Sequence, residues 1–180
     1  MFADYDDQGN SRDNPKATDD AEAHYNLGND YLAWNLPEKA VVEYEKTIKI
    51  RPEYAKAYSN LAVAFARLSR VKDAIINFRK VVELEPNNPG ARFNLANILV
   101  ETGSVDEAIV QLVNTIQLAP QDSLAHGTLA NLLLQKNEIE LAIQEYGYAL
   151  DIDPNNENAQ AGLEKALIKQ SGGGQPGASR

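Results

Sequence analysis

The chain has 180 residues, of which 43% are hydrophobic and 24% are charged, a composition typical of a folded protein. Its net charge of −9 disfavours contact with phosphate backbones, which proteins bind through clustered lysine and arginine, so we expect no nucleic-acid role. Because the sequence contains no cysteine, disulfides, thiolate zinc sites and cysteine nucleophiles are excluded.

The N-terminal segment, residues 1–19, is rich in Asp, Asn and Gly and lacks apolar periodicity, which predicts a disordered acidic arm. Asp19 or Asp20 is then expected to cap the first helix. The segment does not resemble a secretory signal, and no apolar run approaches the roughly 18 residues that a membrane span requires. We therefore expect a cytoplasmic protein that does not insert into membranes.

Residues 20–156 are periodic. The prolines at positions 52, 86, 120 and 154 are 34 residues apart, and the same spacing relates Asn-Leu pairs at 26, 60 and 94 to Thr128-Leu129. Apolar residues at spacings of three and four predict two amphipathic helices in each unit. The turn between the two helices of each unit is expected at Asn35, Ser69, Gly103 and Asn137, and Gly and Asn tolerate the left-handed conformation that ends a helix. The predicted repeats are 21–54, 55–88, 89–122 and 123–156.

A unit of 34 residues with Leu-Gly or Leu-Ala, a later Ala, a further large apolar residue and a closing Pro resembles the tetratricopeptide repeat. The resemblance implies an all-α, right-handed solenoid of four helix–turn–helix units whose apolar stripes are buried by stacking. Residues 157–169 are expected to form a C-terminal capping helix, and residues 170–180 a flexible Gly-rich tail. The sequence departs from the repeat where the family has a bulky apolar residue, at His24, Tyr58, Arg92 and His126.

Catalytic and metal sites need groups that converge. The two histidines, His24 and His126, occupy equivalent positions three repeats apart, so they cannot share a metal ion, and we interpret them as polar packing between helices. No glycine-rich phosphate loop follows a strand pattern. We predict no catalytic residue, no metal and no cofactor, and therefore a protein that is not an enzyme.

The resemblance implies that the first helix of each pair lines a concave groove. Residues spaced three, four, seven and eight apart share one side of a helix, which selects the candidate groove residues. They are Tyr25, Asn26, Asn29, Lys56, Asn60, Arg67, Phe93, Asn94, Asn97, Leu124, Thr128 and Asn131.

Three of these asparagines, Asn26, Asn60 and Asn94, recur in register and are followed by Thr128. A carboxamide both donates and accepts hydrogen bonds, so such a ladder could grip the backbone of an extended peptide. It resembles the asparagine ladder in the repeat domain of O-linked N-acetylglucosamine transferases. In the alternative interpretation these amides cap or bridge within the repeats. Large groove residues such as Tyr25 either anchor partner side chains or pack between repeats.

A second binding mode of the family, the carboxylate clamp, fits less well. Asn29 and Asn60 match it, but Tyr25, Gly90 and Asn94 occupy positions where the clamp has basic residues.

The sequence thus favours a non-catalytic scaffold or adaptor that binds an extended segment of another protein. A permanent structural subunit of a larger complex, or a self-associating solenoid, is the alternative. An enzyme, or a fragment of one, is a third hypothesis that no residue pattern supports.

Overall fold

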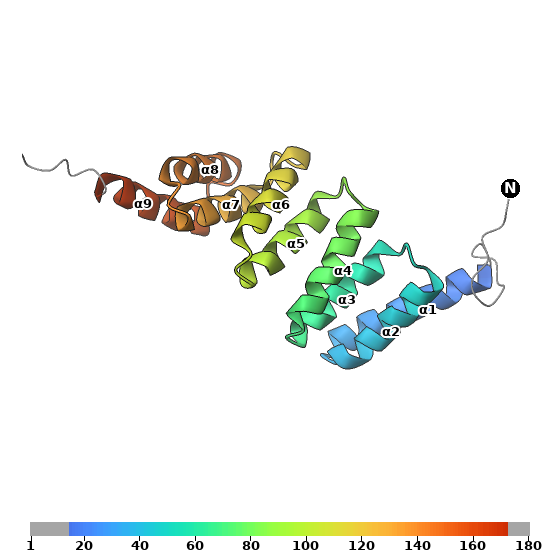
Figure 1. Ribbon diagram of the computed structural model, residues 1–180. Helices are drawn as coiled ribbons and strands as arrows, with labels where there is room; N and C mark the ends of the chain where they lie inside the picture. Colours follow the sequence, from blue (N-terminus) through green and yellow to red (C-terminus); the bar gives the residue numbers. More distant parts are fainter. Residues whose placement is uncertain (1–14, 173–180) are drawn as a thin grey trace, which may run out of the picture. The chain divides into compact units, whose positions relative to one another are not determined.

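The computed structural model describes residues 15–172 of the chain, in two compact units, Met1–Asn87 and Asn88–Arg180. Every regular element in the described residues is an α-helix (Figure 1). The predictions for residues 1–14 and 173–180 lie outside the described residues. No helix in the described part has both the length and the apolar character needed to cross a membrane.

The first unit consists of two helix pairs. Its helices are α1 (Pro15–Ala33), α2 (Pro37–Ile50), α3 (Ala55–Arg67) and α4 (Val71–Leu84). Within this unit α1 packs against α2, α2 against α3 and α3 against α4, and α1 also contacts α3. The first helices of successive repeats are therefore neighbours, as in a stack of helix pairs.

The second unit repeats this arrangement and adds a single helix. Its helices are α5 (Pro89–Glu101), α6 (Val105–Leu118), α7 (Ser123–Gln135), α8 (Ile139–Ile152) and α9 (Glu157–Gly172). Helix α9 packs against both α7 and α8, at the red end of the chain in Figure 1. It begins at the residue expected for the capping helix and runs three residues past the predicted end at 169.

Local signals set most helix ends. Pro37 and Pro89 stand in the first turns of α2 and α5, where the missing N–H costs nothing. The Asn88 side chain accepts a hydrogen bond from the Ala91 N–H at 3.2 Å and so caps α5. The predicted turns are confirmed, and all four turn residues have positive φ, Ser69 included: 57° at Asn35, 58° at Ser69, 73° at Gly103 and 65° at Asn137.

The start of the first helix differs from the expectation. Helix α1 begins at Pro15, so residues 15–19 are helical, and Asp19 and Asp20 lie inside the helix rather than capping it. Proline suits the first turn of a helix, and no glycine or second proline follows it for a further twelve residues. Once a helix is nucleated, each added residue gains one hydrogen bond, so extension does not need an apolar stripe.

Small residues bring the helices together. The recurring alanines of the second helices, at 40, 74, 108 and 142, are fully buried. Gly28 of α1 lies against the ring of Tyr44 from α2, and a Cβ at Gly28 would stand 2.6 Å from Tyr44 Cε1. Since Tyr44 is itself fully buried, a larger residue at position 28 has no room.

The two histidines at the fourth position of the repeats pair with a glutamate on the second helix of their own repeat. His24 Nδ1 lies 2.6 Å from Glu43 Oε2, and His126 Nδ1 lies 2.7 Å from Glu145 Oε2. The interpretation of the histidines as polar packing between helices is confirmed. Burial alone would raise the pKa of Glu43, but hydrogen bonds from Lys46 and His24 outweigh it, and the net shift of this pKa is downward.

Candidate protein-binding face

The candidate residues lie on the first helices of the repeats. We call the outward side chains of α1 and α3 the first-helix face of the first unit, and those of α5, α7 and α9 the first-helix face of the second unit. Seven candidates are exposed and five are half-buried. The exposed ones are Asn26, Lys56, Arg67, Asn94, Asn97, Leu124 and Asn131; the half-buried ones are Tyr25, Asn29, Asn60, Phe93 and Thr128.

In the first unit, three candidates and a core tyrosine form one hydrogen-bonded cluster. Asn29 Oδ1 accepts a hydrogen bond from the Tyr44 hydroxyl at 2.8 Å and another from Asn60 Nδ2 at 2.8 Å. Asn60 Nδ2 also donates to the Tyr25 hydroxyl oxygen at 3.2 Å. Burial of the Tyr44 ring raises its pKa to about 12, so the phenol keeps its proton and remains a donor.

Asn60 therefore bridges the first two repeats. Its amide nitrogen has two hydrogens, and both are used within the cluster, which leaves only the carbonyl oxygen for a partner. Asn26, by contrast, is exposed and has no side-chain partner within the described part of the chain. The two residues share a register position but have different hydrogen-bonding capacity.

Tyr25 packs against aromatic side chains of its own repeat, and its hydroxyl contact with Asn60 crosses to the second repeat. Its ring centroid lies 6.0 Å from that of Tyr44 and 5.1 Å from that of Tyr54, whose hydroxyl donates to Glu22 Oε2 at 2.9 Å. The Arg51 guanidinium lies over the Tyr54 ring at 4.4 Å. Most of the Tyr25 ring is thus committed to intramolecular contacts, which favours the packing interpretation for this residue.

The two basic candidates differ in their contacts. Arg67 Nη1 donates to the Leu32 carbonyl oxygen at 2.9 Å, which also accepts from the Asn35 N–H at 3.1 Å, so its guanidinium adds a second hydrogen bond at the end of α1. Lys56 is exposed and has no ion-pair partner within residues 15–172. Lys56 is therefore an available cation on this face, whereas Arg67 joins neighbouring repeats.

On the second unit, Asn94 and Asn97 are exposed amides of α5 without side-chain partners in the described residues. The Thr128 hydroxyl donates to the Leu124 carbonyl oxygen of its own helix at 2.8 Å, so it can only accept from a partner. Leu124 is 62% exposed, which leaves its isobutyl group open to an apolar contact. Phe93 is half-buried.

Asn131 takes part in a contact like that of Asn29. The Tyr146 hydroxyl donates to Asn131 Oδ1 at 2.6 Å, at the floor of a slot of about 380 Å³ between α7 and α9. Sequence reasoning missed the α9 side of this slot, which Asn158, Gly162 and Lys165 line. A signal was present, because Gly162 stands 34 residues after Thr128, at the ladder position, and has no side chain.

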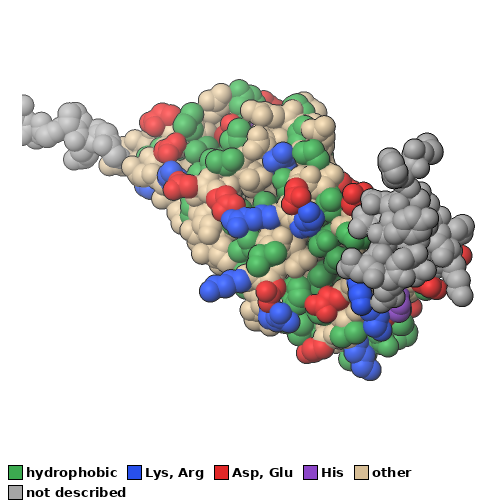
Figure 2. Space-filling model, turned by 45° about the vertical axis from the view of Figure 1, so that its right-hand side comes forward, with side chains coloured by type: hydrophobic (Ala, Val, Ile, Leu, Met, Phe, Trp, Pro, Cys, Tyr) green, Lys and Arg blue, Asp and Glu red, His purple; other side chains and the backbone are tan. Residues whose placement is uncertain are grey.

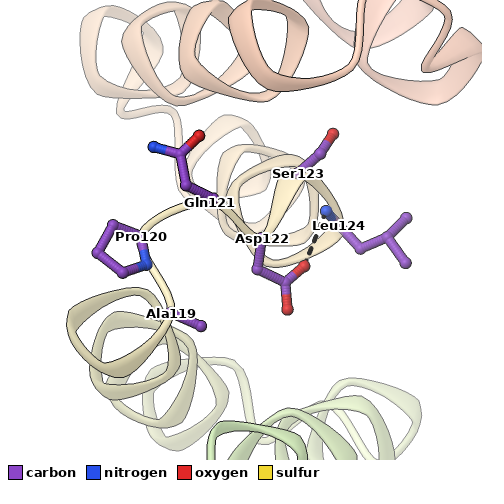
Figure 3. Close-up of a pocket in the computed structure, with 6 residues that line it drawn as sticks. All are labelled: Ala119, Pro120, Gln121, Asp122, Ser123 and Leu124. Carbon is purple, nitrogen blue, oxygen red and sulfur yellow. Dashed lines mark hydrogen bonds between the residues drawn. The ribbon is translucent and has the colours of Figure 1, made fainter.

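A second hollow, of about 450 Å³, lies beside the loop between α6 and α7 (Figure 3). Six consecutive residues, 119–124, line it, and the Asp122 carboxylate already accepts from the Leu124 and Ala125 N–H groups at 3.1 and 3.0 Å. No set of polar side chains from different elements converges there, so this hollow is a surface feature of the loop.

Charge is not segregated on the face shown in Figure 2, where acidic and basic side chains alternate with apolar ones. Within residues 15–172, no three His, Asp or Glu side chains form a group that could hold a metal ion. The chemistry offered by the first-helix faces is that of amides, a few cations and isolated apolar side chains.

Comparison with known proteins identifies the repeat. Tetratricopeptide repeat models match residues 69–132 and 124–156, and a third model, also of this repeat, matches residues 38–69. Together these matches run without a gap from residue 38 to residue 156. No curated protein sequence matches the chain.

Solved structures share the fold. YrrB, described as a TPR protein with an unusual peptide-binding site, is 20% identical with a TM-score of 0.75, over 87% of this chain and 80% of that one. MamA from Desulfovibrio magneticus RS-1 is 22% identical with a TM-score of 0.79, over 85% and 86%. PilF of Pseudomonas aeruginosa is 25% identical with a TM-score of 0.74, over 87% and 72%. The chain belongs to the tetratricopeptide repeat family and is an all-α helical repeat solenoid.

Proposed function

We propose that this protein is a non-catalytic scaffold of the cytoplasm that holds an extended segment of a partner protein against its first-helix faces. Tetratricopeptide repeats are protein-interaction modules, which sets the class of function. The observation that carries the finer proposal is the set of exposed side-chain amides that have no partner among the described residues, Asn26 on the first unit and Asn94 and Asn97 on the second.

These amides suit a peptide backbone. Each presents two N–H donors and a carbonyl acceptor, which complement the C=O and N–H of a peptide group. Hydrogen bonds of this kind do not depend on the side chains of the partner. Asn60 contributes its carbonyl oxygen to the first-helix face of the first unit. Leu124 adds an apolar contact, and Lys56 adds a positive charge that could meet an acidic residue of the partner.

The experiment compares two triple variants in partner binding. In the first variant Asn26, Asn94 and Asn97 are replaced by alanine. In the matched control, the exposed Glu45, Lys72 and Gln117 of the second helices are replaced by alanine, which leaves the net charge unchanged. Partners cross-linked in native extract are identified by mass spectrometry, and their labelled segments are titrated against each purified protein.

At about 0.5–1.5 kcal/mol for each lost hydrogen bond, the asparagine variant should bind roughly tenfold to a thousandfold more weakly. The control should bind as the parent does. Unchanged affinity of the asparagine variant, with its helical circular dichroism spectrum intact, would remove the amides from the binding surface.

A second candidate, self-association or permanent assembly into a larger complex, is favoured by one observation. Leu167 and Ile168 of α9 are 46% and 62% exposed. A dimer in light scattering of the purified protein that dissociates on Ile168→Glu would support this candidate, and a monomer at all concentrations would count against self-association.

A further inference from the structure

A pocket of about 380 Å³ lies beside the second helices of the third and fourth repeats. Ile116 of α6 and Ile152 of α8 provide apolar walls, Tyr148 and Asp151 of α8 bring polar groups, and His126 of α7 adds a further side. All of these residues belong to the second unit, and none is a candidate of the first-helix faces. The volume is in the range of pockets that hold small ligands. We call this pocket the Tyr148 pocket.

The first and fourth repeats share a histidine–glutamate pair, but only the first repeat completes it with a lysine. Lys46 Nζ donates to the second carboxylate oxygen of Glu43, Oε1, at 2.8 Å. In the fourth repeat the residue in register with Lys46 is Tyr148. The matching oxygen of Glu145 therefore has no cation beside it among the described residues.

The second repeat shows the same exchange at the position of Asp151. Lys80 is in register with Tyr148 and donates to Glu83 Oε1 at 2.7 Å, and Glu83 is in register with Asp151. Asp151 is exposed and has no hydrogen-bond or ion-pair partner within residues 15–172. The Tyr148 pocket thus keeps the carboxylates of these two repeats and has an aromatic ring where they have a lysine.

The Tyr148 ring is available for stacking. The side chain is 44% exposed, and its hydroxyl oxygen accepts from Gln144 Nε2 at 2.9 Å. The His126 ring packs beside it, with the two ring centroids 5.5 Å apart. Both His126 nitrogens already face acceptors, Glu145 Oε2 at 2.7 Å and the Pro120 carbonyl oxygen at 3.1 Å. His126 is therefore a fixed wall of the pocket and not a polar group for a ligand.

The charge around the pocket favours a cation. Lys136 is the one Lys or Arg among residues 105–153, and it already pairs with Asp106 at 2.6 Å. The Glu145 carboxylate balances any positive charge on the His126 ring. A positive ligand would meet the Asp151 carboxylate without competition from a lysine, whereas an anion would be repelled.

An arginine suits these groups better than a lysine does. Its guanidinium is planar, stacks on aromatic rings and forms two parallel hydrogen bonds with a carboxylate, which an ammonium group cannot do. The chain uses this arrangement itself, because the Arg70 guanidinium lies 4.3 Å from the Phe65 ring centroid while its Nε donates to Asp73 Oδ2 at 2.7 Å. The methylene groups of an arginine would contact the apolar walls of the pocket.

We infer that the Tyr148 pocket binds an arginine side chain of a partner protein, stacked on Tyr148 and paired with Asp151. The partner then supplies the cation that Lys46 and Lys80 supply within their own repeats. This contact surface is additional to the first-helix faces and does not use the amides of the proposed function.

The test uses the full-length protein with ¹³C-labelled δ1 methyl groups of isoleucine. The probe is acetyl-Ala-Ala-Arg-Ala-Ala-amide. A neutral probe carries citrulline at the central position, which has nearly the shape of arginine without its charge, and a third probe carries lysine there. The methyl signals of Ile116 and Ile152 report binding, and that of Ile76 of α4, in the first unit, is the internal reference.

The arginine probe should shift the Ile116 and Ile152 signals saturably and leave the Ile76 signal unchanged. The lysine probe should bind about threefold more weakly or worse, because it lacks the stacking and the second hydrogen bond. The citrulline probe should cause no saturable shift. No shift with arginine, equal affinity for lysine, or saturable binding of citrulline would overturn the inference.

A pair of charge variants connects the binding to the pocket. Asp151→Asn should weaken binding of the arginine probe by about tenfold, the effect of losing one charge-assisted hydrogen bond. Glu140→Gln removes the same charge from an exposed position of α8 outside the pocket, and should bind as the parent does. Retained affinity in Asp151→Asn, or an equal loss in Glu140→Gln, would also overturn the inference.

Variants of Tyr148 test the comparison between repeats. Tyr148→Lys gives the fourth repeat the lysine of the first and second repeats, and should abolish arginine binding because the pocket then holds its own cation. Tyr148→Phe keeps the ring and should bind the probe within about twofold of the parent. Arginine binding at the parent's affinity in Tyr148→Lys would contradict the inference. The triple asparagine variant described above should bind the probe normally, so this inference and the proposed function can fail separately.

Discussion

The Tyr146 hydroxyl donates a hydrogen bond to Asn131 Oδ1 at 2.6 Å, and the same bond joins Tyr44 to Asn29 at 2.8 Å in the first repeat. Each pair is separated by 15 residues and links the two helices of one repeat. Both tyrosines are fully buried, and a buried hydroxyl needs a partner. These asparagines therefore stabilise the fold by accepting a hydrogen bond from a buried hydroxyl, in addition to lying on the candidate binding face.

The two middle repeats show the complementary case. Where the core residue is Phe78 or Leu112, it carries no hydroxyl, and the facing position holds Val63 or the exposed Asn97. Asn97 has no side-chain partner in the described residues and is free for other contacts. The identity of the core residue thus decides whether the asparagine is structural.

The first prediction is a double-mutant cycle on Tyr146 and Asn131. Tyr146→Phe should lower the free energy of unfolding by about 0.5–1.5 kcal/mol, the value of one hydrogen bond. Asn131→Leu should cost more, about 1–3 kcal/mol, because it leaves the buried hydroxyl without an acceptor. The double variant should cost less than the sum of the two, as measured by urea denaturation. Strict additivity would show that the bond contributes nothing.

The second prediction concerns the close approach of α1 and α2. Gly28→Ala places a Cβ 2.6 Å from Tyr44 Cε1, and the buried ring cannot move aside, so we expect a loss of about 1–3 kcal/mol. Gly147→Ala is the matched control, since a Cβ there meets nothing within 4 Å. The control should gain about 0.5–1 kcal/mol from helix propensity. Equal melting temperatures for the two variants would contradict the overlap.

The third prediction uses the left-handed turns. Ser69 has a φ of 58°, which costs a residue with a Cβ about 1 kcal/mol, so Ser69→Gly should stabilise the protein by a similar amount. The reverse change at the equivalent turn, Gly103→Ser, should destabilise it, because Gly103 has a φ of 73°. Thermal unfolding followed by circular dichroism measures both. A loss of stability in Ser69→Gly would mean that the serine makes a compensating contact.

The fourth prediction is a loss of stability in alkali. Burial raises the pKa of Tyr44 to about 12, above its ordinary value of 10.0, so the folded protein holds this proton more tightly than the unfolded chain does. The contribution of the protonated Tyr44 phenol to the free energy of unfolding is fully present below pH 10 and is lost as the pH rises towards 12. Tyr44→Phe has no proton to lose at this position.

The measurement is the unfolding midpoint of both proteins from pH 8 to pH 12. The difference in unfolding midpoint between the parent protein and Tyr44→Phe should be constant up to pH 10, and the midpoint of the parent should then fall relative to that of the variant. Other groups, such as Tyr54, titrate in both proteins and cancel in the difference. A constant difference across the whole range would show that the Tyr44 phenol ionises normally.

The sequence alone determined the repeat register, the turn residues and the class of fold. These features rest on local physics: the period of apolar residues, the helix-starting prolines and the residues that tolerate positive φ. Each signal acts within a few residues, so it can be read along the chain. The turns at Asn35, Ser69, Gly103 and Asn137 were predicted for this reason.

Only the tertiary structure decided which side chains have hydrogen-bonding groups available for a partner protein. Asn26 and Asn60 are alike in sequence, yet Asn60 is held by residues 31 and 35 positions away, across a repeat boundary. Gly162 must be a glycine only because Tyr146 of another helix lies directly against it, where a Cβ would stand 2.3 Å from the ring. Hydrogen bonds and pockets of this kind depend on how closely helices that are distant in sequence approach each other. The periodic pattern of residues along the chain does not determine the distance between such helices.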